Sequence, residues 1–261
     1  MSRIVLKFGT GTLSRSAGRA LDSGQFRRVA AEISALVRAG HPCVIVSSAA
    51  IAAGVHLLKL DRRPDDLPGK QACAAAGQPE LMRMYSAAFR RHDLIVAQLL
   101  LTHDDIDSRM RRMNAFNTIE RILAAGNIVP IINENDTVAV EELRFGDNDR
   151  LSAEVAHLVN ADVLLLLTSS DGLNDSEGQR IAKAGDVSEV FQYVRPDKGE
   201  MSVGGMRAKL QAVDFAISHG IATCILDGRK PGQIAAAMEG KDVGTRFLVR
   251  GRGGSRRKVR I

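Results

Sequence analysis

The sequence predicts an α/β protein with a three-layer, doubly wound, mainly parallel sheet, and two observations lead to this prediction. Short β-rich runs that are continuously apolar recur along the 261 residues, and runs of this length are typical of strands buried on both faces of a parallel sheet. Segments with a helical spacing of apolar residues lie between these runs. Strands that alternate with helices predict βαβ crossovers, which place helices on both faces of the sheet.

Seven segments have the composition of buried strands, and two of the intervening segments show a clear helical pattern. The predicted strands are 3–8, 43–48, 94–101, 127–132, 162–167, 221–226 and 245–249. The predicted helices are 23–40 and 206–220, because apolar residues line one face of each. Ser23 is the predicted N-cap of the first helix and Gly40 its end.

Residues 1–249 are predicted to form one domain with two lobes, about 1–160 and about 161–249, because no linker-like segment divides the chain earlier. Residues 250–261 form a basic tail with six Arg or Lys residues and no acid, whereas the remainder carries 30 basic and 30 acidic residues. The tail could be a nucleic-acid-binding arm or a disordered, solvated end, and we favour the disordered end. A content of only 4% aromatic residues also argues against a nucleic-acid partner.

Three cysteines are spread along the chain without a C-x-x-C motif, at Cys43, Cys73 and Cys224. This pattern argues against a disulfide framework or a zinc site and favours a reducing compartment. Cys43 and Cys224 lie in apolar runs, so we expect them to be buried small hydrophobic residues. The sequence shows neither a signal peptide nor an apolar run long enough to span a bilayer, so we expect a cytoplasmic protein without a membrane partner.

Ligands of doubly wound sheets bind beyond the carboxyl ends of the strands, so the residues that follow each strand are candidate site residues. Lys7 ends the first strand, and the Gly-rich turn that begins at Gly9 could cradle phosphate. Ser47 and Ser48 follow the second strand and could hold a carboxylate. From this stretch alone, capping of the next helix by Ser48 is the better explanation.

Residues 132–153 are unusually polar for a segment that follows a buried strand. A buried charge destabilises a fold unless it is paired, so this crowding indicates either a polar pocket or a solvated acidic loop. We favour the pocket, with a substrate ammonium group as the partner, because an apolar helix follows at once. The polar side chains are Asn133, Glu134, Asn135, Asp136, Asp147, Asn148 and Asp149.

The later part of the chain has two further candidate segments. Thr168 and Ser169 follow a predicted strand and could meet a nucleotide. Gly204 and Gly205 precede the helix that carries Lys209. Backbone amides and a lysine provide the positioning and charge stabilisation that a transferring phosphoryl group needs.

Taken together, these residues resemble the amino acid kinase family over about residues 3–249. The most specific part of the likeness is the pair of motifs INEND and GDND at their present separation. The resemblance is carried by SSAAIAAG (47–54), KQACAAAGQPELM (70–82), NAFNTI (114–119), VPIINENDTVAVEELRFGDNDRLSA (129–153), LLLLTSSDGL (164–173) and GGMRAKLQAV (205–213).

Within the family, the chain is most similar to members that phosphorylate L-glutamate. This implies a phosphotransferase with a carboxyl group as acceptor, which forms γ-glutamyl phosphate from ATP and the γ-carboxylate in the first step of proline biosynthesis. The cofactors would be ATP and Mg²⁺, with the metal held through the phosphates. The first lobe would bind glutamate and the second lobe the nucleotide. The resemblance also implies a homodimer or homotetramer and allows for feedback inhibition by proline.

The resemblance assigns roles residue by residue. The implied catalytic residues are Lys7, Asp149 and Lys209, with Asp149 organising the two lysines. The implied substrate-binding residues are Ser48, Ala49, Asp136 and Asn148. The implied ATP-binding residues are Lys7, Gly9, Thr168, Ser169, Gly204, Gly205, Met206 and Lys209.

The chain departs from the family pattern at several positions. The family usually has Gly where Ala49 stands and Asp where Ser169 stands, and a longer Ser/Gly-rich loop before Gly204. Many relatives carry a C-terminal RNA-binding-type (PUA) domain, in whose place we expect at most the basic tail. Three alternatives remain: a kinase of the same fold for another small carboxylate, a non-catalytic relative that senses glutamate or proline, and an RNA-binding protein that uses the tail.

Overall fold

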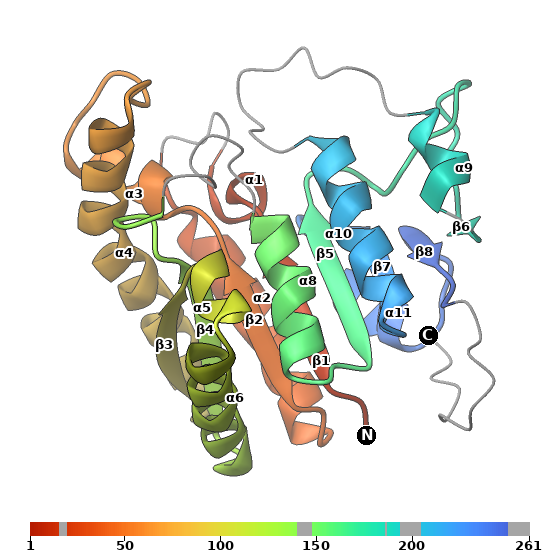
Figure 1. Cartoon of the computed structure of the whole chain (residues 1–261), viewed down its shortest axis with the longest axis horizontal. Coiled ribbons are helices and arrows are strands. Elements are labelled where there is room, and N and C mark those ends of the chain that lie inside the picture. The colour runs from red at the N-terminus through yellow and green to blue at the C-terminus, as the bar shows by residue number, and fades with distance from the viewer. Residues whose placement is uncertain (16–19, 140–147, 186, 194–204, 250–261) are drawn as a thin grey trace.

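The computed structural model describes residues 1–15, 20–139, 148–185, 187–193 and 205–249 (Figure 1). The strands are β1 (Ile4–Phe8), β2 (Cys43–Ser47), β3 (Ile95–Leu101), β4 (Ile128–Glu134), β5 (Val163–Thr168), β6 (Lys183–Ala184), β7 (Ala222–Asp227) and β8 (Thr245–Phe247). The helices are α1 (Thr10–Leu13), α2 (Ser23–Arg38), α3 (Ala50–Leu57), α4 (Leu67–Phe89), α5 (His103–Asp107), α6 (Arg109–Ala124), α8 (Asn148–Leu158), α9 (Val187–Phe191), α10 (Met206–Ser218) and α11 (Gln233–Met238), with a short 3₁₀ helix η1 (Arg90–His92).

The strands form a single sheet in the order β3-β4-β2-β1-β5-β7-β8-β6. In the part of the chain that the structure describes, these strands pair in parallel except for β7 with β8. The predicted mainly parallel, doubly wound α/β class is therefore confirmed. The sheet contains strands from both predicted lobes, while the division into lobes stays a prediction.

Helices cover both faces of the sheet, which produces the three predicted layers (Figure 1). Ile4, Leu6 and Phe8 of β1 pack into one core with residues of α2, α4 and α11. Val5 packs into a second core on the opposite face, with residues of α6, α8 and α10. Because successive residues of a strand point to opposite faces, Lys7 shares the face of Val5 and points towards α8 and α10.

The seven predicted strands are all present, but the environment of one was predicted wrongly. The apolar run 94–101 was expected to be buried on both faces like the others. It forms β3 at the edge of the sheet, where Ile95 is 56% exposed. The two-residue strand β6 was not predicted.

The two predicted helices are present, with one correction at a terminus. Asp22 rather than Ser23 caps α2, and its carboxylate accepts a hydrogen bond from the Gly24 amide at 2.8 Å. Gly40 follows the helix with φ +85°, a conformation that suits glycine.

All three cysteines are buried and unpaired with one another. Burial raises the pKa of the Cys43 and Cys224 thiols to about 12, so both are neutral at physiological pH and pack as small hydrophobic groups, as predicted. The basic tail lies outside the described residues. Among the helices that are described, none has both the length and the apolarity that crossing a bilayer requires.

Candidate active site

Three charged side chains from separate elements meet at the carboxyl end of β1. Asp149, in the first turn of α8, is fully buried and forms ion pairs with both Lys7 and Lys209. Its Oδ1 is bound by the Lys7 ammonium, and its Oδ2 lies 3.0 Å from the Lys209 Nζ. A carboxylate in the first turn is also favoured by the helix dipole. We call these three residues the lysine pair cluster.

The lysine pair cluster carries two positive charges and one negative charge in a nearly dry environment. The Lys7 side chain is 6% exposed and that of Lys209 17%. A buried charge must be paired, so the carboxylate holds both ammonium groups in place while one positive charge remains in excess. Such an arrangement can stabilise an anionic group whose charge changes during a reaction.

Asn148, the neighbour of Asp149, belongs to a separate network of neutral hydrogen bonds. Its side-chain Nδ2 lies 2.8 Å from the Ser47 carbonyl oxygen, 2.8 Å from the Asn133 Oδ1 and 3.1 Å from the Ser48 Oγ, and these three acceptors share its two N–H donors. The structure therefore brings together Ser48 and Asn148, which the sequence placed a hundred residues apart. The alternative that Ser48 caps the following helix is wrong, because the N-cap of α3 is Ala49 and no side chain caps it.

Ala49 adopts a left-handed backbone conformation, with φ +87° and ψ +4°. This conformation is rare for a residue with a Cβ atom and costs roughly 1–2 kcal/mol. The left-handed conformation explains why glycine, which the family usually has here, suits this position. In this chain Ala49 adopts that conformation although its side chain is a methyl group. The residue is 5% exposed and lies directly after Ser48.

Helices α3 and α4 are in backbone contact through two glycines. A methyl group added at Gly54 would lie 1.8 Å from the Cys73 carbonyl oxygen, and one added at Gly77 would lie 1.9 Å from the Ala50 carbonyl oxygen. Because neither glycine has a side chain, the backbone of α4 can pack directly against the first turns of α3. This contact fixes the position of the polar turn that contains Ser48.

Asp136 lies in the turn after β4 and is partly buried. Desolvation lowers the pKa of the Arg63 guanidinium, and the negative charge of Asp136 partly opposes this shift. Arg63 therefore lies within electrostatic reach of Asp136, which places a cation and an anion at this end of the sheet. Arg63 was not identified from the sequence, because the loop before α4 has no motif that would single out one of its arginines.

The candidate nucleotide residues lie at the ends of β1 and β5. The Thr168 Oγ1 accepts from the Ser170 amide at 2.9 Å, which closes the turn after β5. Ser169 lies over the first turn of the chain, with its Oγ 3.7 Å from the position that a Cβ atom of Gly11 would take. Gly9 lies in the same turn, and its amide donates to the Leu167 carbonyl at 3.3 Å.

The remaining predicted nucleotide residues lie at the start of α10. Gly205 is the N-cap of this helix and Met206 its first residue. Lys209 follows one turn later on the same helix, so α10 joins Gly205 to one member of the lysine pair cluster. Gly204 lies outside the described residues.

Two cations that the sequence did not single out join the segments that follow β1, β5 and β7. The Arg229 Nε donates to the Gly11 carbonyl at 2.8 Å, and the Lys230 ammonium pairs with Asp171 at 2.9 Å. The hydrogen bond that the Lys230 ammonium donates to Asp171 raises the pKa of Lys230. Both cations follow β7, so the same rule that drew attention to the ends of the other strands could have identified them.

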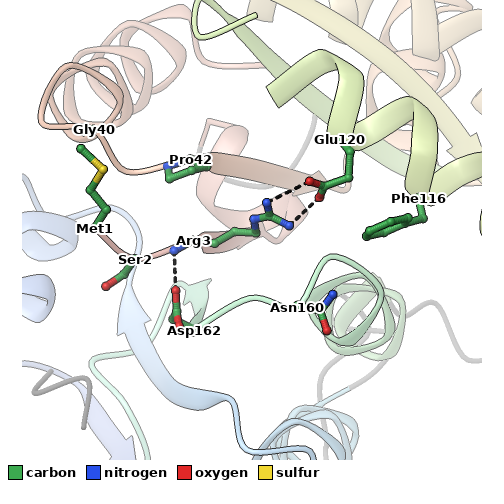
Figure 2. A pocket seen from close by; sticks show the side chains of 9 residues that line it. All are labelled: Met1, Ser2, Arg3, Gly40, Pro42, Phe116, Glu120, Asn160 and Asp162. Carbon is green, nitrogen blue, oxygen red and sulfur yellow. Dashed lines mark hydrogen bonds and ion pairs between the residues drawn. The ribbon is translucent and has the colours of Figure 1, made fainter. Parts of the chain in front are cut away.

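A separate hollow of about 490 Å³ lies at the opposite end of the sheet (Figure 2). Its main charged groups are already satisfied, because the Arg3 guanidinium binds Glu120 at 2.5 and 3.1 Å and the Arg3 amide donates to Asp162 at 2.7 Å. The hollow is formed at the amino ends of strands, where doubly wound folds do not usually bind ligands. We therefore assign it no role in the site.

Comparisons with known proteins agree with the sequence and the fold. Residues 2–227 match the amino acid kinase family. A glutamate 5-kinase from Myxococcus xanthus is 44% identical over 99% of this chain and 69% of its own length. Glutamate 5-kinases from Anaeromyxobacter dehalogenans and Thermus thermophilus are 46% and 44% identical, over 95% and 96% of this chain and 67% and 68% of their own lengths.

Two solved structures have the same fold at low sequence identity. The UMP kinase from Bacillus anthracis aligns with a TM-score of 0.61 and 16% identity, over 96% of this chain and 97% of its own. An N-acetylglutamate synthase from Neisseria gonorrhoeae, complexed with coenzyme A and L-arginine, aligns with a TM-score of 0.64 and 16% identity, over 96% of this chain and 62% of its own. Together with the match over residues 2–227, these findings show that the chain belongs to the amino acid kinase family.

Proposed function

We propose that the chain transfers the γ-phosphoryl group of MgATP to the γ-carboxylate of L-glutamate and forms γ-glutamyl phosphate and ADP, the first step of proline biosynthesis. One observation carries the proposal: the adjacent residues Asn148 and Asp149 join a network of neutral amides to a pair of lysines. An amino acid needs directional recognition, whereas a transferring phosphoryl group needs positive charge. The likeness to glutamate 5-kinases supports the choice of glutamate.

The chemistry requires little of the protein beyond placement and charge. The side-chain carboxyl of glutamate has an ordinary pKa near 4.3 and is ionised at neutral pH, so no general base is needed. A carboxylate oxygen forms a bond to the γ-phosphorus while the bond from that phosphorus to the β,γ-bridging oxygen breaks, and the electron pair leaves with ADP. The main barrier is the approach of two anions, which Lys7 and Lys209 lower by their positive charge.

Each candidate residue has a distinct part in this proposal. Asp149 holds the two lysines at a fixed separation. On the substrate side, Asp136 and the Asn148 side-chain oxygen accept from the glutamate ammonium, and Ser48 and Ala49 form the adjoining turn. The nucleotide would contact Gly9, Thr168, Ser169, Gly204, Gly205 and Met206. Mg²⁺ would arrive on the ATP phosphates, which suits a hard cation that keeps oxygen ligands and water.

We also propose that the chain forms a homodimer or homotetramer and that proline inhibits it. The exposed Ile95 on the edge strand β3 supports self-association, because an apolar, unpaired edge tends to be covered. Light scattering of the purified protein measures the first property. Turnover with and without added proline measures the second.

The proposed reaction is tested by trapping its product. Purified protein is incubated with ATP, Mg²⁺ and hydroxylamine, which converts an acyl phosphate into a stable hydroxamate. We expect hydroxamate with L-glutamate and none with L-aspartate, whose shorter side chain does not bring its carboxylate to the phosphoryl group. A folded protein that forms no hydroxamate from glutamate would contradict the proposal, and product from another small carboxylate would redirect it.

A further inference from the structure

A chain of four side-chain amides connects the edge of the sheet with the substrate end of the site. The Gln78 Nε2 in α4 donates to the Gln98 Oε1 in β3 at 3.0 Å. The Asn133 Nδ2 in β4 donates to the Gln78 Oε1 at 2.8 Å, and the Asn148 Nδ2 in α8 donates to the Asn133 Oδ1 at 2.8 Å. We call these four residues the amide relay, and the resemblance assigns a role to only one of them, Asn148.

Two backbone groups determine the direction of the amide relay. The Ser47 carbonyl can only accept, so it requires the Nδ2 of Asn148 on its side, at 2.8 Å. The Glu134 amide can only donate, so it requires the Oδ1 of Asn133 on its side, at 2.9 Å. Both requirements agree with the hydrogen bond between the two asparagines. Asn133 must then present its Nδ2 to Gln78, and Gln78 must accept with its Oε1.

The direction of the relay decides which atom Asn148 offers to a ligand. In the described part of the chain, the Asn148 side chain makes its hydrogen bonds through its Nδ2. Its Oδ1 therefore lies on the side of the amide that faces away from Ser47 and Asn133, where it can accept a hydrogen bond from a ligand. An acceptor attracts an ammonium group, whereas a flipped amide would present a donor and repel it. The orientation of Asn148 therefore matters for an amino-acid substrate.

Because the amide relay is buried, the loss of one of its hydrogen bonds would destabilise the protein. Gln78 is 9% exposed and Asn133 is 2% exposed. A buried amide that loses its partner keeps its desolvation penalty, so removal of the Gln78 oxygen would leave the Asn133 Nδ2 without an acceptor. Asn133 could then regain a partner only by turning, which would withdraw its oxygen from Asn148.

We propose that Gln78 is a positioning residue for substrate recognition: through Asn133 it fixes the Asn148 amide with its oxygen towards the substrate ammonium. This inference rests on the proposed function for the identity of the substrate, but the relay itself is independent of turnover. The hydrogen-bond partners of the Gln78 side chain in the described residues are Gln98 and Asn133. We therefore expect a change at Gln78 to alter the binding of the amino acid and not that of ATP.

Two variants of the same residue provide the kinetic test. Gln78→Met keeps the length of the side chain but cannot accept, so we expect the KM for glutamate to rise about three- to tenfold, the size expected for one neutral hydrogen bond. The KM for ATP and kcat should change less than twofold. Gln78→Glu retains an acceptor for Asn133, and the exposed Gln98 can turn to meet it, so the KM for glutamate should return to within about twofold of the original value.

A matched control separates this effect from a general loss of stability. Gln192→Met makes the same chemical change at an exposed residue directly after α9, where the side chain donates to the Glu189 carbonyl. We expect no change in either KM. Equal glutamate KM values for Gln78→Met and the original protein would overturn the proposal. Equal rises in both KM values in Gln78→Met would show a merely structural role and overturn it as well.

A readout that needs no activity distinguishes failure of the relay from failure of the proposed function. In ¹⁵N-labelled protein, the side-chain NH₂ signals of Asn133 and Asn148 should exchange slowly with solvent, while that of Gln192 exchanges fast. The Asn148 signal should move in Gln78→Met and stay in place in Gln78→Glu. Fast exchange in the original protein, or an unmoved Asn148 signal in Gln78→Met, would overturn the relay even if glutamate is phosphorylated. A protein with the expected signals but no turnover of glutamate would support the relay and count against the proposed function alone.

Should Gln78→Met not fold, the exchange measurement on the original protein and the kinetics of Gln78→Glu still decide the matter. Protected NH₂ signals together with a near-original glutamate KM in Gln78→Glu support the relay. Fast exchange overturns it.

Discussion

The amide relay and the lysine pair cluster meet at two consecutive residues, Asn148 and Asp149, yet they are built on different physical principles. The amide relay is neutral, and each hydrogen bond in it has a direction set by the backbone. The lysine pair cluster is charged, and its carboxylate accepts ammonium groups from two sides. Directional bonds suit recognition of a small molecule, whereas charge in a dry environment suits a group whose charge changes during reaction.

This difference predicts separate kinetic signatures for the two regions. An interaction made equally in the bound and the transition state changes KM, whereas one made mainly in the transition state changes kcat. Damage to the substrate side should therefore appear in the KM for glutamate, and damage to the lysine pair cluster in kcat.

The largest effect is expected from Lys209→Ala. Loss of one preorganised charge near the phosphoryl group should lower kcat about 10²- to 10³-fold and leave the KM for glutamate nearly unchanged. Lys209→Arg should also be slow, because a planar guanidinium does not reproduce a compact ammonium. Steady-state kinetics measure both variants.

A control for this prediction is Lys241→Ala, an exposed lysine paired with Glu239 at 2.6 Å. It should retain the original kcat. If Lys209→Ala retained it too, Lys209 would have no part in catalysis.

The next largest effect is expected from Asp136→Ala. A charged hydrogen bond to the substrate ammonium contributes about 1.5–3 kcal/mol, so the KM for glutamate should rise about 10- to 150-fold while that for ATP changes little. Asp242→Ala, which removes an exposed carboxylate bound to Arg180, is the matched control. A defect confined to the KM for ATP would mean that the two ends of the site are reversed.

A smaller effect, on stability and substrate binding together, is expected from Gly77→Ala. The added methyl group would meet the Ala50 carbonyl oxygen, so α3 and α4 must separate, at a cost of about 1–3 kcal/mol. Because the contact supports the turn at Ser48, the KM for glutamate should rise as well. Urea unfolding and kinetics measure the two consequences.

Gly185→Ala is the control for this overpacking, since no atom of the described residues, apart from its chain neighbours, lies within 4 Å of the added group. Unchanged stability in Gly77→Ala would show that the two helices can part freely. The close helix contact would then have no bearing on the site.

The smallest effect is expected from Ala49→Gly, which should raise the free energy of unfolding, whereas Gly77→Ala should lower it. Relief of the left-handed strain is worth roughly 1–2 kcal/mol, while the greater freedom of the unfolded glycine chain costs about 0.4–1 kcal/mol. The free energy of unfolding should therefore rise, by at most about 1.6 kcal/mol. Ala53→Gly, in the interior of the same helix, should lower it, and a loss of stability in both variants would contradict the assigned strain.

The comparison of sequence and structure shows which features a sequence pattern can reveal. Apolar runs predicted the seven longer strands because burial on a parallel sheet leaves a continuous signal. The order of strands leaves no such signal, so β3 was expected in the interior although it lies at the edge. The two-residue strand β6 is too short to form a pattern.

The sequence predicted the site residues that stand in motifs at the ends of strands. It did not predict a residue in the interior of a helix that reaches the site only through tertiary packing. Lys7, Asn148 and Asp149 were identified because they end strands or begin a helix. Gln78 lies in the interior of the 23-residue helix α4, and the tertiary packing of α4, which includes its close contact with α3 at Gly77, brings it next to Asn133. Such a register between helices depends on tertiary packing, which the local sequence does not encode.

The central claim, that a carboxylate of glutamate attacks the γ-phosphorus, is tested most directly by isotope transfer. Glutamate labelled with ¹⁸O in its γ-carboxylate is incubated with the protein, MgATP and hydroxylamine, and the released phosphate is analysed by mass spectrometry. Hydroxylamine attacks the acyl carbon, so the bridging oxygen leaves with phosphate. The account predicts one ¹⁸O atom in each phosphate released. Phosphate without the label would show that water, not glutamate, accepts the phosphoryl group.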